Sequence, residues 1–274
     1  MSATAIRLKR LLLTGAAGHL GTVLRPRLKA CCEVLRVSDR ATLGPRSEGE
    51  ELMTADLADK AQVLDLLQGV EAVVHLGGIS TEKTWESILS ANIDGMVNLY
   101  EAARQHGTRR IVFASSNHVT GFYRQDEVIS PKVPVRPDGF YGLSKAFGEN
   151  LAQLYWDKHG IETASLRIGS AFAEPKDRRM LATWMSFDDT ERLIVAALTA
   201  PVVGHTIVYG MSDNARVFWD NTGARHLGYR PLDSSEPFGA AIEARQPTID
   251  IAQPAARFQG GAFVTQGPFF EETP

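Results

Sequence analysis

The 274-residue chain has little cysteine, no long apolar run and no excess of basic charge. Its only cysteines, Cys31 and Cys32, are adjacent. A disulfide between neighbours is strained, so we expect two reduced thiols that pack in the interior. No apolar run approaches the roughly 18 residues needed to cross a bilayer, and no signal-like segment stands at the N-terminus. The sequence therefore predicts a cytoplasmic protein with no membrane partner.

Charge and ligand spacing exclude further classes of partner. The formal net charge is -3, and neither a basic stripe nor a block of like charge occurs, so we expect no nucleic-acid partner. No pair of histidines or carboxylates has the spacing of metal ligands, so we expect no metal site. The chain has an ordinary apolar fraction, 44%, and is long enough to bury one large core.

An apolar run near the N-terminus turns through three glycines into an amphipathic segment. Leu11 and Leu13 lie in the run, and Gly15, Gly18 and Gly21 follow. The first glycine allows the tight strand-to-helix turn, the second lets the backbone reach a pyrophosphate, and the third lets the helix pack close to the strand. Free amides at the helix N-terminus then hold the phosphates. The pattern predicts a dinucleotide-binding turn, although such glycines also occur in plain turns.

A second buried strand, at 34–38, ends at Asp39, about 20 residues past the turn, where a ribose-binding acid is expected. A carboxylate there accepts hydrogen bonds from the ribose hydroxyls and repels a 2′-phosphate, which favours NAD over NADP. Arg40 could pair with a 2′-phosphate, but we expect the charge of Asp39 to dominate. The alternative is a solvated turn residue beside a surface charge.

Apolar strand-like runs alternate with helical patterns along the chain. The runs lie at residues 10–14, 34–38, 72–76, 111–115 and 163–168. This order predicts an α/β protein with a doubly wound parallel sheet, the Rossmann fold, which binds ligands at the carboxyl ends of its strands. We expect residues 1–168 to form an NAD-binding core that carries the catalytic residues. Residues 169–274 should complete the sheet and add a small C-terminal lobe that covers the substrate, within one structural domain.

A helical pattern that runs through Tyr155 places Tyr141 and Lys145 one turn apart on the same face. An ammonium group and a positive nicotinamide both favour the phenolate, so Tyr141 could take a hydroxyl proton. The pair alone also fits a plain surface helix. The strand that ends at 113–118 adds Ser116 at the edge where the nicotinamide should lie, and a serine there can hydrogen-bond the reacting oxygen.

Together these motifs resemble the extended short-chain dehydrogenase/reductase superfamily. The resemblance implies that Tyr141 is the acid/base, that Lys145 orients the nicotinamide ribose and lowers the pKa of Tyr141, and that Ser116 steadies the substrate oxygen. Ser116 is preferred to Ser115 because the serine of the family lies five residues before a glycine, here Gly121. The resemblance also implies a set of cofactor-binding residues: Gly15, Gly18, His19, Leu20, Gly21, Asp39, Asp56, Leu57, Leu76, Gly77, Gly78, Lys145 and Ser170. His19 should act mainly through its backbone.

Further stretches, at residues 74–80, 113–118, 167–170, 178–181 and 257–261, are similar to the bacterial uronate dehydrogenases. This branch implies NAD-dependent oxidation of the C1 of D-glucuronate or D-galacturonate to the aldarolactone, a hexuronate as substrate and a homo-oligomer. It implies these substrate contacts: Ser80, Ser116, Asn117, His118, Ser170 and Arg179. An arginine fork binds a carboxylate through two parallel hydrogen bonds, which suits Arg179.

Four alternatives remain open at this point. Arg179 also fits a solvent-facing loop, and His118 a satisfied structural histidine. The same scaffold with the same Tyr and Lys serves epimerases or dehydratases that act on nucleotide-linked sugars and retain NAD. A catalytically silent NAD sensor would need the sheet but not the Ser116, Tyr141 and Lys145 set.

Overall fold

The computed structural model describes residues 7–246, 248 and 250–269. Its main sheet has seven parallel strands in the order β3-β2-β1-β4-β5-β6-β9. Their bounds are β1 Leu8–Thr14, β2 Cys32–Asp39, β3 Glu50–Thr54, β4 Ala72–His75, β5 Arg110–Ser116, β6 Glu162–Ile168 and β9 His205–Gly210. The strand order reverses beside β1, and the crevice for a ligand opens there, at the carboxyl ends of the strands.

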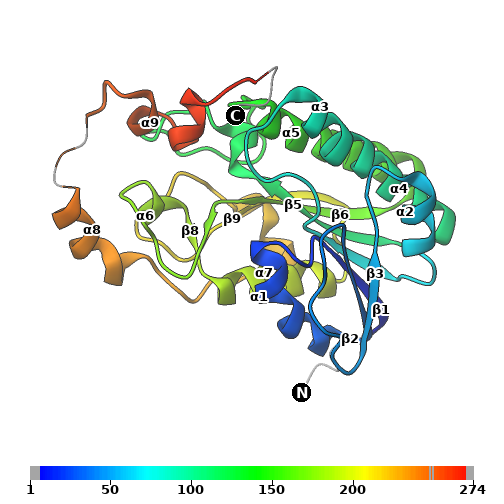
Figure 1. Ribbon diagram of the computed structural model, residues 1–274. Coiled ribbons are helices and arrows are strands. Elements are labelled where there is room, and N and C mark those ends of the chain that lie inside the picture. The colour runs from blue at the N-terminus through cyan, green and yellow to red at the C-terminus, as the bar shows by residue number, and fades with distance from the viewer. Residues whose placement is uncertain (1–6, 247, 249, 270–274) are drawn as a thin grey trace.

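Helices cover both faces of the sheet, with α1 and α7 on one and α2, α4 and α5 on the other (Figure 1). Their bounds are α1 His19–Leu28, α2 Lys60–Leu66, α4 Gly95–His106, α5 Phe140–His159 and α7 Phe187–Thr199. The short helices are α3 Trp85–Ile88, α6 Met180–Thr183, α8 Gly239–Arg245 and α9 Pro254–Arg257. A π-helical turn spans Leu89–Asp94, and 3-10 turns span Lys29–Cys31, Asn117–Thr120, Thr222–Leu227, Glu236–Phe238 and Gly261–Thr265.

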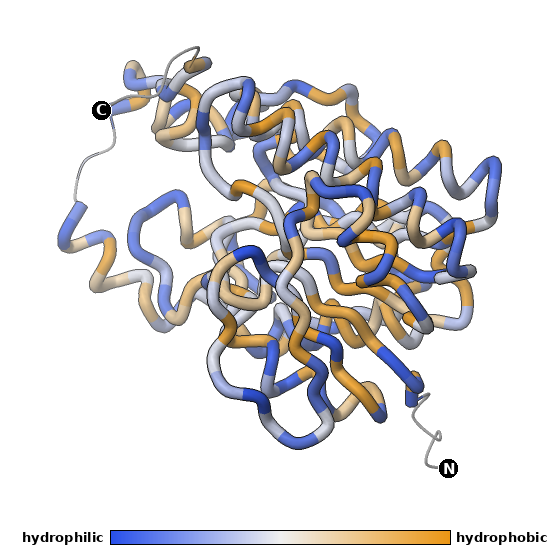
Figure 2. Tube along the Cα trace, turned by 45° about the vertical axis from the view of Figure 1, so that its right-hand side comes forward, coloured by the Kyte–Doolittle hydropathy of each residue, from blue (hydrophilic) through white to orange (hydrophobic). Residues whose placement is uncertain are grey.

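Two apolar clusters form because successive side chains of a strand point to opposite faces. Leu11 and Leu13 join the cluster under α1 and α7, whereas Leu12 joins the cluster under α2 and α4, and all three are fully buried. Strands covered on both faces are apolar at nearly every position. Figure 2 shows this as hydrophobic colour that follows the strands. The helices therefore need only one apolar stripe each.

The doubly wound parallel sheet is confirmed, and each of the five expected strands is present. Two further strands of the sheet, β3 and β9, had not been placed. The α5 helix runs beyond the expected Tyr155 to His159 and ends at Gly160, whose φ of 66° is left-handed. Residues 41–49 form a loop whose side chains are almost all exposed.

Segments after β6 gather beyond the carboxyl ends of the strands. The short parallel strands β7 Ser170–Ala171 and β8 Trp184–Met185 pair with each other there. Helices α6, α8 and α9 lie on the same side of the molecule in Figure 1. The chain after residue 168 thus supplies the last strand of the sheet and several segments beyond the carboxyl ends of the strands.

Two smaller expectations concern membranes and thiols. No helix in the described part of the chain is long and apolar enough to cross a bilayer. Cys31 and Cys32 are both free thiols, and burial raises the pKa of Cys32 to about 11. A thiol with so high a pKa is protonated at neutral pH and is a poor nucleophile.

Candidate active site

One cavity of about 1410 Å³ opens at the carboxyl ends of the strands. It runs from the glycine turn, past the ends of β2, β4 and β5, to the segments that follow β6. Every residue expected to bind cofactor or substrate lines it, and so do Tyr141 and Lys145. The fold therefore brings the whole expected set to one place.

The glycine turn has the shape that a dinucleotide requires. Gly15 has a φ of +69°, and a Cβ on it would lie 2.6 Å from the carbonyl carbon of Leu76. A Cβ on Gly21 would lie 2.1 Å from the carbonyl oxygen of Gly15, so the helix packs directly on the turn. Gly18 caps α1 without any side-chain hydrogen bond. Side chains at these positions would close the space in which backbone amides meet a ligand.

Asp39 is fixed at the end of β2 beside this turn. Its Oδ2 accepts a hydrogen bond from the Ala17 amide at 3.0 Å, and its Oδ1 accepts one from the Ala41 amide at 3.0 Å. Arg40 lines the same cavity and is exposed. The carboxylate thus has a defined place at this end of the cavity, and the arginine next to it is exposed to solvent.

The first turn of α5, which carries Tyr141, is held by an acid that the sequence reasoning missed. Glu82 accepts hydrogen bonds from the amides of Phe140 at 2.8 Å and Tyr141 at 2.9 Å. A Cβ on Gly139 would lie 2.3 Å from Glu82 Oε2, so only glycine permits this approach. A carboxylate at a helix N-terminus also complements the helix dipole. No local signal marks Glu82, because its partners lie 58 and 59 residues away.

Asn92 is a second residue that the sequence did not reveal. It lies in the π-helical turn, a distortion that often occurs at functional sites. Its Oδ1 accepts a hydrogen bond from the Ile79 amide at 2.7 Å, and its Nδ2 donates to Ser144 Oγ at 2.9 Å. Ser144 in turn donates to the carbonyl oxygen of Tyr141 at 2.7 Å. Asn92 thereby ties the loop after β4 to the helix turn that bears Tyr141.

Tyr141 and Lys145 are both buried, and their Cαs are one turn apart on α5. Burial raises the pKa of Tyr141 to about 12, against the effect of a hydrogen bond with Ser116. Burial also lowers the pKa of Lys145 to about 8. The ammonium nitrogen lies 5.0 Å from the centre of the Phe113 ring and 5.7 Å from that of Tyr141.

The expected lowering of the tyrosine pKa is therefore not seen in the protein by itself. Desolvation disfavours the charged form of each group, and for Tyr141 it outweighs the hydrogen bond with Ser116. A positively charged ring bound beside Tyr141 would stabilise the phenolate and so lower the pKa of Tyr141.

The two serines at the end of β5 have different partners. Ser115 donates to Glu149 Oε1 at 2.7 Å, and Glu149 forms a buried ion pair with Arg167 at 2.8 Å. Ser116 accepts a hydrogen bond from the His118 amide at 3.2 Å and also interacts with the Tyr141 hydroxyl. The choice of Ser116 over Ser115 thus agrees with the geometry, because the hydroxyl of Ser115 is engaged in the core.

His118 pairs with a buried acid and also lines the cavity. Its Nδ1 lies 2.6 Å from Asp138 Oδ2, and its ring stacks on Phe263 with 3.9 Å between centroids. Burial lowers the pKa of His118, while Asp138 acts in the opposite direction. With Nδ1 held by Asp138, the neutral ring keeps Nε2 available as an acceptor. His118 is therefore both a satisfied histidine and a wall of the site.

Arg179 is held in the cavity entirely by neutral groups. Its Nε donates to the carbonyl oxygen of Gln259 at 2.6 Å, and its Nη1 lies 3.5 Å from Ser170 Oγ. With the Asn117 amide turned to satisfy both neighbours, Asn117 accepts from Arg179 Nη2 at 2.9 Å and donates to the Ile168 carbonyl oxygen at 3.1 Å. No carboxylate in the described part of the chain forms an ion pair with Arg179, and burial lowers the pKa of Arg179. A desolvated cation of this kind is stabilised by an incoming anion.

The other expected substrate contacts are more loosely defined. Ser170 shares a hydrogen bond of 2.9 Å with Thr183, which fixes it near Arg179. Ser80 lines the cavity but is exposed. No group of three or more acidic, histidine or cysteine side chains that could hold a metal ion occurs in the described residues.

Comparison with known proteins finds relatives over nearly the whole chain. The model of the NAD dependent epimerase/dehydratase family matches residues 11–205. A uronate dehydrogenase from Pseudomonas putida is 57% identical over 267 residues, which cover 97% of this chain and 99% of that protein. One from Agrobacterium fabrum is 51% identical over 266 residues, which cover 97% of this chain and 100% of that protein.

A solved structure has the same fold. It is a mutant of the uronate dehydrogenase from Agrobacterium tumefaciens complexed with NAD, 51% identical to this chain. The superposition has a TM-score of 0.94 and covers 96% of this chain and 100% of that one. The likeness therefore includes the segments after residue 168 as well as the sheet.

Proposed function

The chain belongs to the NAD dependent epimerase/dehydratase family, and we propose that it is an NAD-dependent uronate dehydrogenase. Its substrate is a free hexuronate, D-glucuronate or D-galacturonate, and its product is the aldarolactone. Membership of the family determines the fold but not the reaction, because enzymes that act on sugar nucleotides have the same fold. The half-buried Arg179, whose side-chain hydrogen-bond partners are all neutral, is the observation that carries the choice of substrate.

The residues at one end of the cavity fit NAD. The free amides at the start of α1 would hold the diphosphate, and Asp39 would bind the adenosine ribose. Asp56, Leu57, Leu76, Gly77 and Gly78 would line the space for the rest of the dinucleotide, and Lys145 would bind the nicotinamide ribose. NAD, when bound, accepts the hydride that leaves the substrate.

The catalytic residues act on the C1 hydroxyl of the sugar. Ser116 hydrogen-bonds the oxygen, and Tyr141 takes its proton as C1 loses the hydride, which leaves a C1 carbonyl, the lactone. Lys145 holds its charge close to Tyr141 and favours the phenolate when the proton moves. Glu82 acts through the backbone by fixing the helix turn on which Tyr141 stands.

Arg179 determines which carbon faces the cofactor. A uronate carries one carboxylate, at the carbon farthest along the chain from C1. When this carboxylate pairs with Arg179, C1 is directed toward Tyr141 and Ser116. Asn117, His118, Ser170 and Ser80 then contact the ring hydroxyls. An uncharged sugar would leave the guanidinium without an ion-pair partner.

The first experiment measures NADH absorbance when the protein is mixed with NAD and either uronate. Glucose and a nucleotide-linked glucose are the controls. We expect rapid NADH formation with the free acids only. No NADH from either acid, together with isomerisation of the nucleotide-linked sugar, would identify an epimerase that retains its NAD. Cofactor binding without any turnover would instead identify a sensor.

The Asp39→Asn variant tests the cofactor choice. The amide keeps the size and one acceptor oxygen, but it loses the charge that repels a 2′-phosphate. We expect the preference for NAD over NADP, measured as the ratio of kcat/KM values, to fall by about 10- to 100-fold, the worth of a charge-assisted hydrogen bond. Arg40→Ala is the companion variant and should lower the use of NADP alone. An unchanged ratio in Asp39→Asn would show that the ribose lies elsewhere.

The cytoplasmic location, the homo-oligomer and the division at residue 168 stay predictions. For the last, we propose that residues 169–274 complete the same structural domain, since β9 pairs with β6 of the core.

A further inference from the structure

Asp138 is a buried acid that the reaction proposed above does not use. Its side chain is only 1% exposed, and its Oδ2 lies 2.6 Å from His118 Nδ1. The other oxygen, Oδ1, is buried and has no hydrogen-bond partner in the described part of the chain. A carboxylate that is buried with a single partner is unfavourable for stability. Its presence beside the cavity therefore points to a role in the site.

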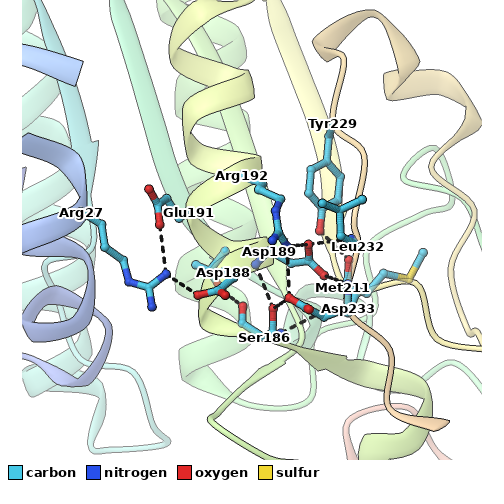
Figure 3. Close-up of polar contacts among 12 residues, drawn as sticks. Arg27, Ser186, Asp188, Asp189, Glu191, Arg192, Met211, Tyr229, Leu232 and Asp233 are labelled. Carbon is cyan, nitrogen blue, oxygen red and sulfur yellow. Dashed lines mark hydrogen bonds and ion pairs between the residues drawn. The ribbon is translucent and has the colours of Figure 1, made fainter. Parts of the chain in front are cut away.

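Another buried acid of the protein shows what full compensation looks like. Asp189 of α7 pairs with Arg192 at 2.6 Å and accepts hydrogen bonds from the amides of Leu232 at 2.9 Å and Asp233 at 3.1 Å (Figure 3). Among the residues that the structure describes, Asp138 has no arginine or lysine partner, and its carboxylate contacts one imidazole only. The stability of the fold does not account for such a pair.

Three glycines from separate segments enclose the carboxylate of Asp138. A Cβ on Gly121 would lie 1.9 Å from Oδ2, one on Gly260 would lie 2.0 Å from Oδ2, and one on Gly142 would lie 3.1 Å from Oδ1. Gly121 follows the 3-10 turn that bears His118, Gly142 lies in the first turn of α5, and Gly260 precedes the last 3-10 turn. This close packing holds Oδ2 against Nδ1.

The contact determines which ring nitrogen of His118 carries the proton. An ionised carboxylate only accepts hydrogen bonds, so Nδ1 must donate. Burial lowers the pKa of His118, Arg179 acts in the same direction, and Asp138 and Glu82 act in the opposite one. The ring is therefore neutral at neutral pH, and its Nε2 keeps an unprotonated lone pair.

This second nitrogen is the one left for a ligand. His118 lines the cavity, and none of the described residues forms a hydrogen bond with Nε2. The ring stacks on Phe263 at 3.9 Å and meets the ring of Tyr141 edge-on at 5.7 Å, measured between centroids. Because the sugar is proposed to react at Tyr141, the acceptor nitrogen of His118 lies beside the bound sugar.

We propose that Asp138 is a positioning residue that makes His118 a hydrogen-bond acceptor for one ring hydroxyl of the uronate. The inference rests on the proposed binding of a uronate in this cavity. A hydroxyl at this place must donate to Nε2, and a substituent of similar size without a proton is rejected. Asp138 thus contributes to specificity without touching the substrate.

The first test determines the tautomer in the protein without substrate. Nitrogen-15 spectra of histidine-labelled protein distinguish protonated from unprotonated ring nitrogens, and His118→Gln identifies the signals of His118. We expect Nδ1 protonated and Nε2 unprotonated in the wild type at neutral pH. In Asp138→Ala the acceptor is gone, and a form protonated at Nε2 should appear. His75, whose Nδ1 contacts Thr14 Oγ1 at 2.8 Å, is the internal control and should not change.

A second variant guards against misfolding of the first. Asp138→Asn keeps the size of the side chain, and its amide nitrogen can donate to Nδ1 of His118. The form protonated at Nε2 should therefore appear in this variant too. An unchanged thermal unfolding transition shows that either variant is folded.

The second test measures kcat/KM, by NADH formation, for D-glucuronate and for its 2-, 3- and 4-deoxyfluoro analogues. Fluorine replaces the hydroxyl but cannot donate a hydrogen bond. At one ring position, the ratio of the value for glucuronate to that for the analogue should be about 5- to 100-fold higher in the wild type than in Asp138→Ala. This range is that of a buried group left without its partner.

Glucuronate itself should lose less in Asp138→Ala, because its hydroxyl can turn and accept from a protonated Nε2. Asp65→Asn is the matched control. It removes an exposed carboxylate of α2 that does not line the cavity, and its ratios should equal those of the wild type.

Three results would each overturn the proposal. They are a wild-type His118 protonated at Nε2, a tautomer that is the same in the wild type and in the folded Asp138 variants, and ratios for all three analogues that do not change in Asp138→Ala. If the spectra behave as expected and no uronate is oxidised, Asp138 sets the tautomer and the choice of substrate fails. If uronates are oxidised and the tautomer does not depend on Asp138, only the role of Asp138 fails.

Discussion

Replacing Tyr141 with phenylalanine is expected to lower kcat for uronate oxidation by about 10²- to 10⁴-fold, the range of a general base. The change removes one hydroxyl and leaves the ring, which is only 7% exposed, in its packing. The glycine turn and Asp39 lie elsewhere in the cavity, so the Kd for NAD should stay close to that of the wild type. Turnover is measured as NADH formation at saturating uronate and NAD, and cofactor binding by calorimetry.

Tyr155→Phe is the matched control for this variant. Tyr155 lies on the same helix about four turns further along, its hydroxyl donates to Glu101 at 3.4 Å, and it does not line the cavity. Its removal should leave kcat unchanged. A Tyr141→Phe enzyme that keeps near-normal turnover would refute Tyr141 as the base. A joint loss of turnover and NAD binding would show instead that the helix had moved.

The parts of the fold that could be predicted are those whose burial leaves a pattern in neighbouring residues of the sequence. Strands buried between two helical layers are apolar at almost every position, so runs such as Leu11–Leu13 are visible in the sequence. The two edge strands, β3 and β9, lack such a continuous apolar run. The strand β3 has five residues and begins with two glutamates, and β9 begins with a histidine and has only a short apolar run. Only their pairing with β2 and β6 makes them strands.

The residues of the site likewise fall into those that the sequence could predict and those that it could not. The glycine turn and the Tyr141 and Lys145 pair depend on spacing within one turn of helix, and the sequence displays that spacing directly. Glu82, Asp138 and Gln259 could not be found, because each acts on a residue far along the chain. Gln259, for example, holds Arg179 across 80 residues. The depth of burial is equally hidden in the sequence, and it is burial that raises the pKa of Tyr141 in the protein by itself.

The Arg179→Ala variant is expected to lower kcat/KM for D-glucuronate by about 30- to 1000-fold, chiefly through KM. This range corresponds to roughly 2 to 4 kcal/mol, as for one partner of a desolvated, hydrogen-bonded charge pair. D-glucuronamide has the same shape without the charge, and its kcat/KM should fall far less. The variant should thus remove most of the preference of the wild type for the acid over the amide. Both substrates are assayed by NADH formation at fixed NAD.

Arg179 also bonds to Gln259, Ser170 and Asn117, so its truncation could loosen the site as well as remove the charge. Arg179→Lys separates these effects, because lysine keeps the charge but cannot reproduce the planar fork. It should retain part of the preference for the acid while losing kcat/KM on both substrates. Arg178→Ala removes the neighbouring arginine, which bonds to the Gln246 carbonyl oxygen at 2.8 Å, and it should leave the preference intact. Equal losses on acid and amide in Arg179→Ala would mean that the guanidinium supports the fold of the site and does not read the carboxylate.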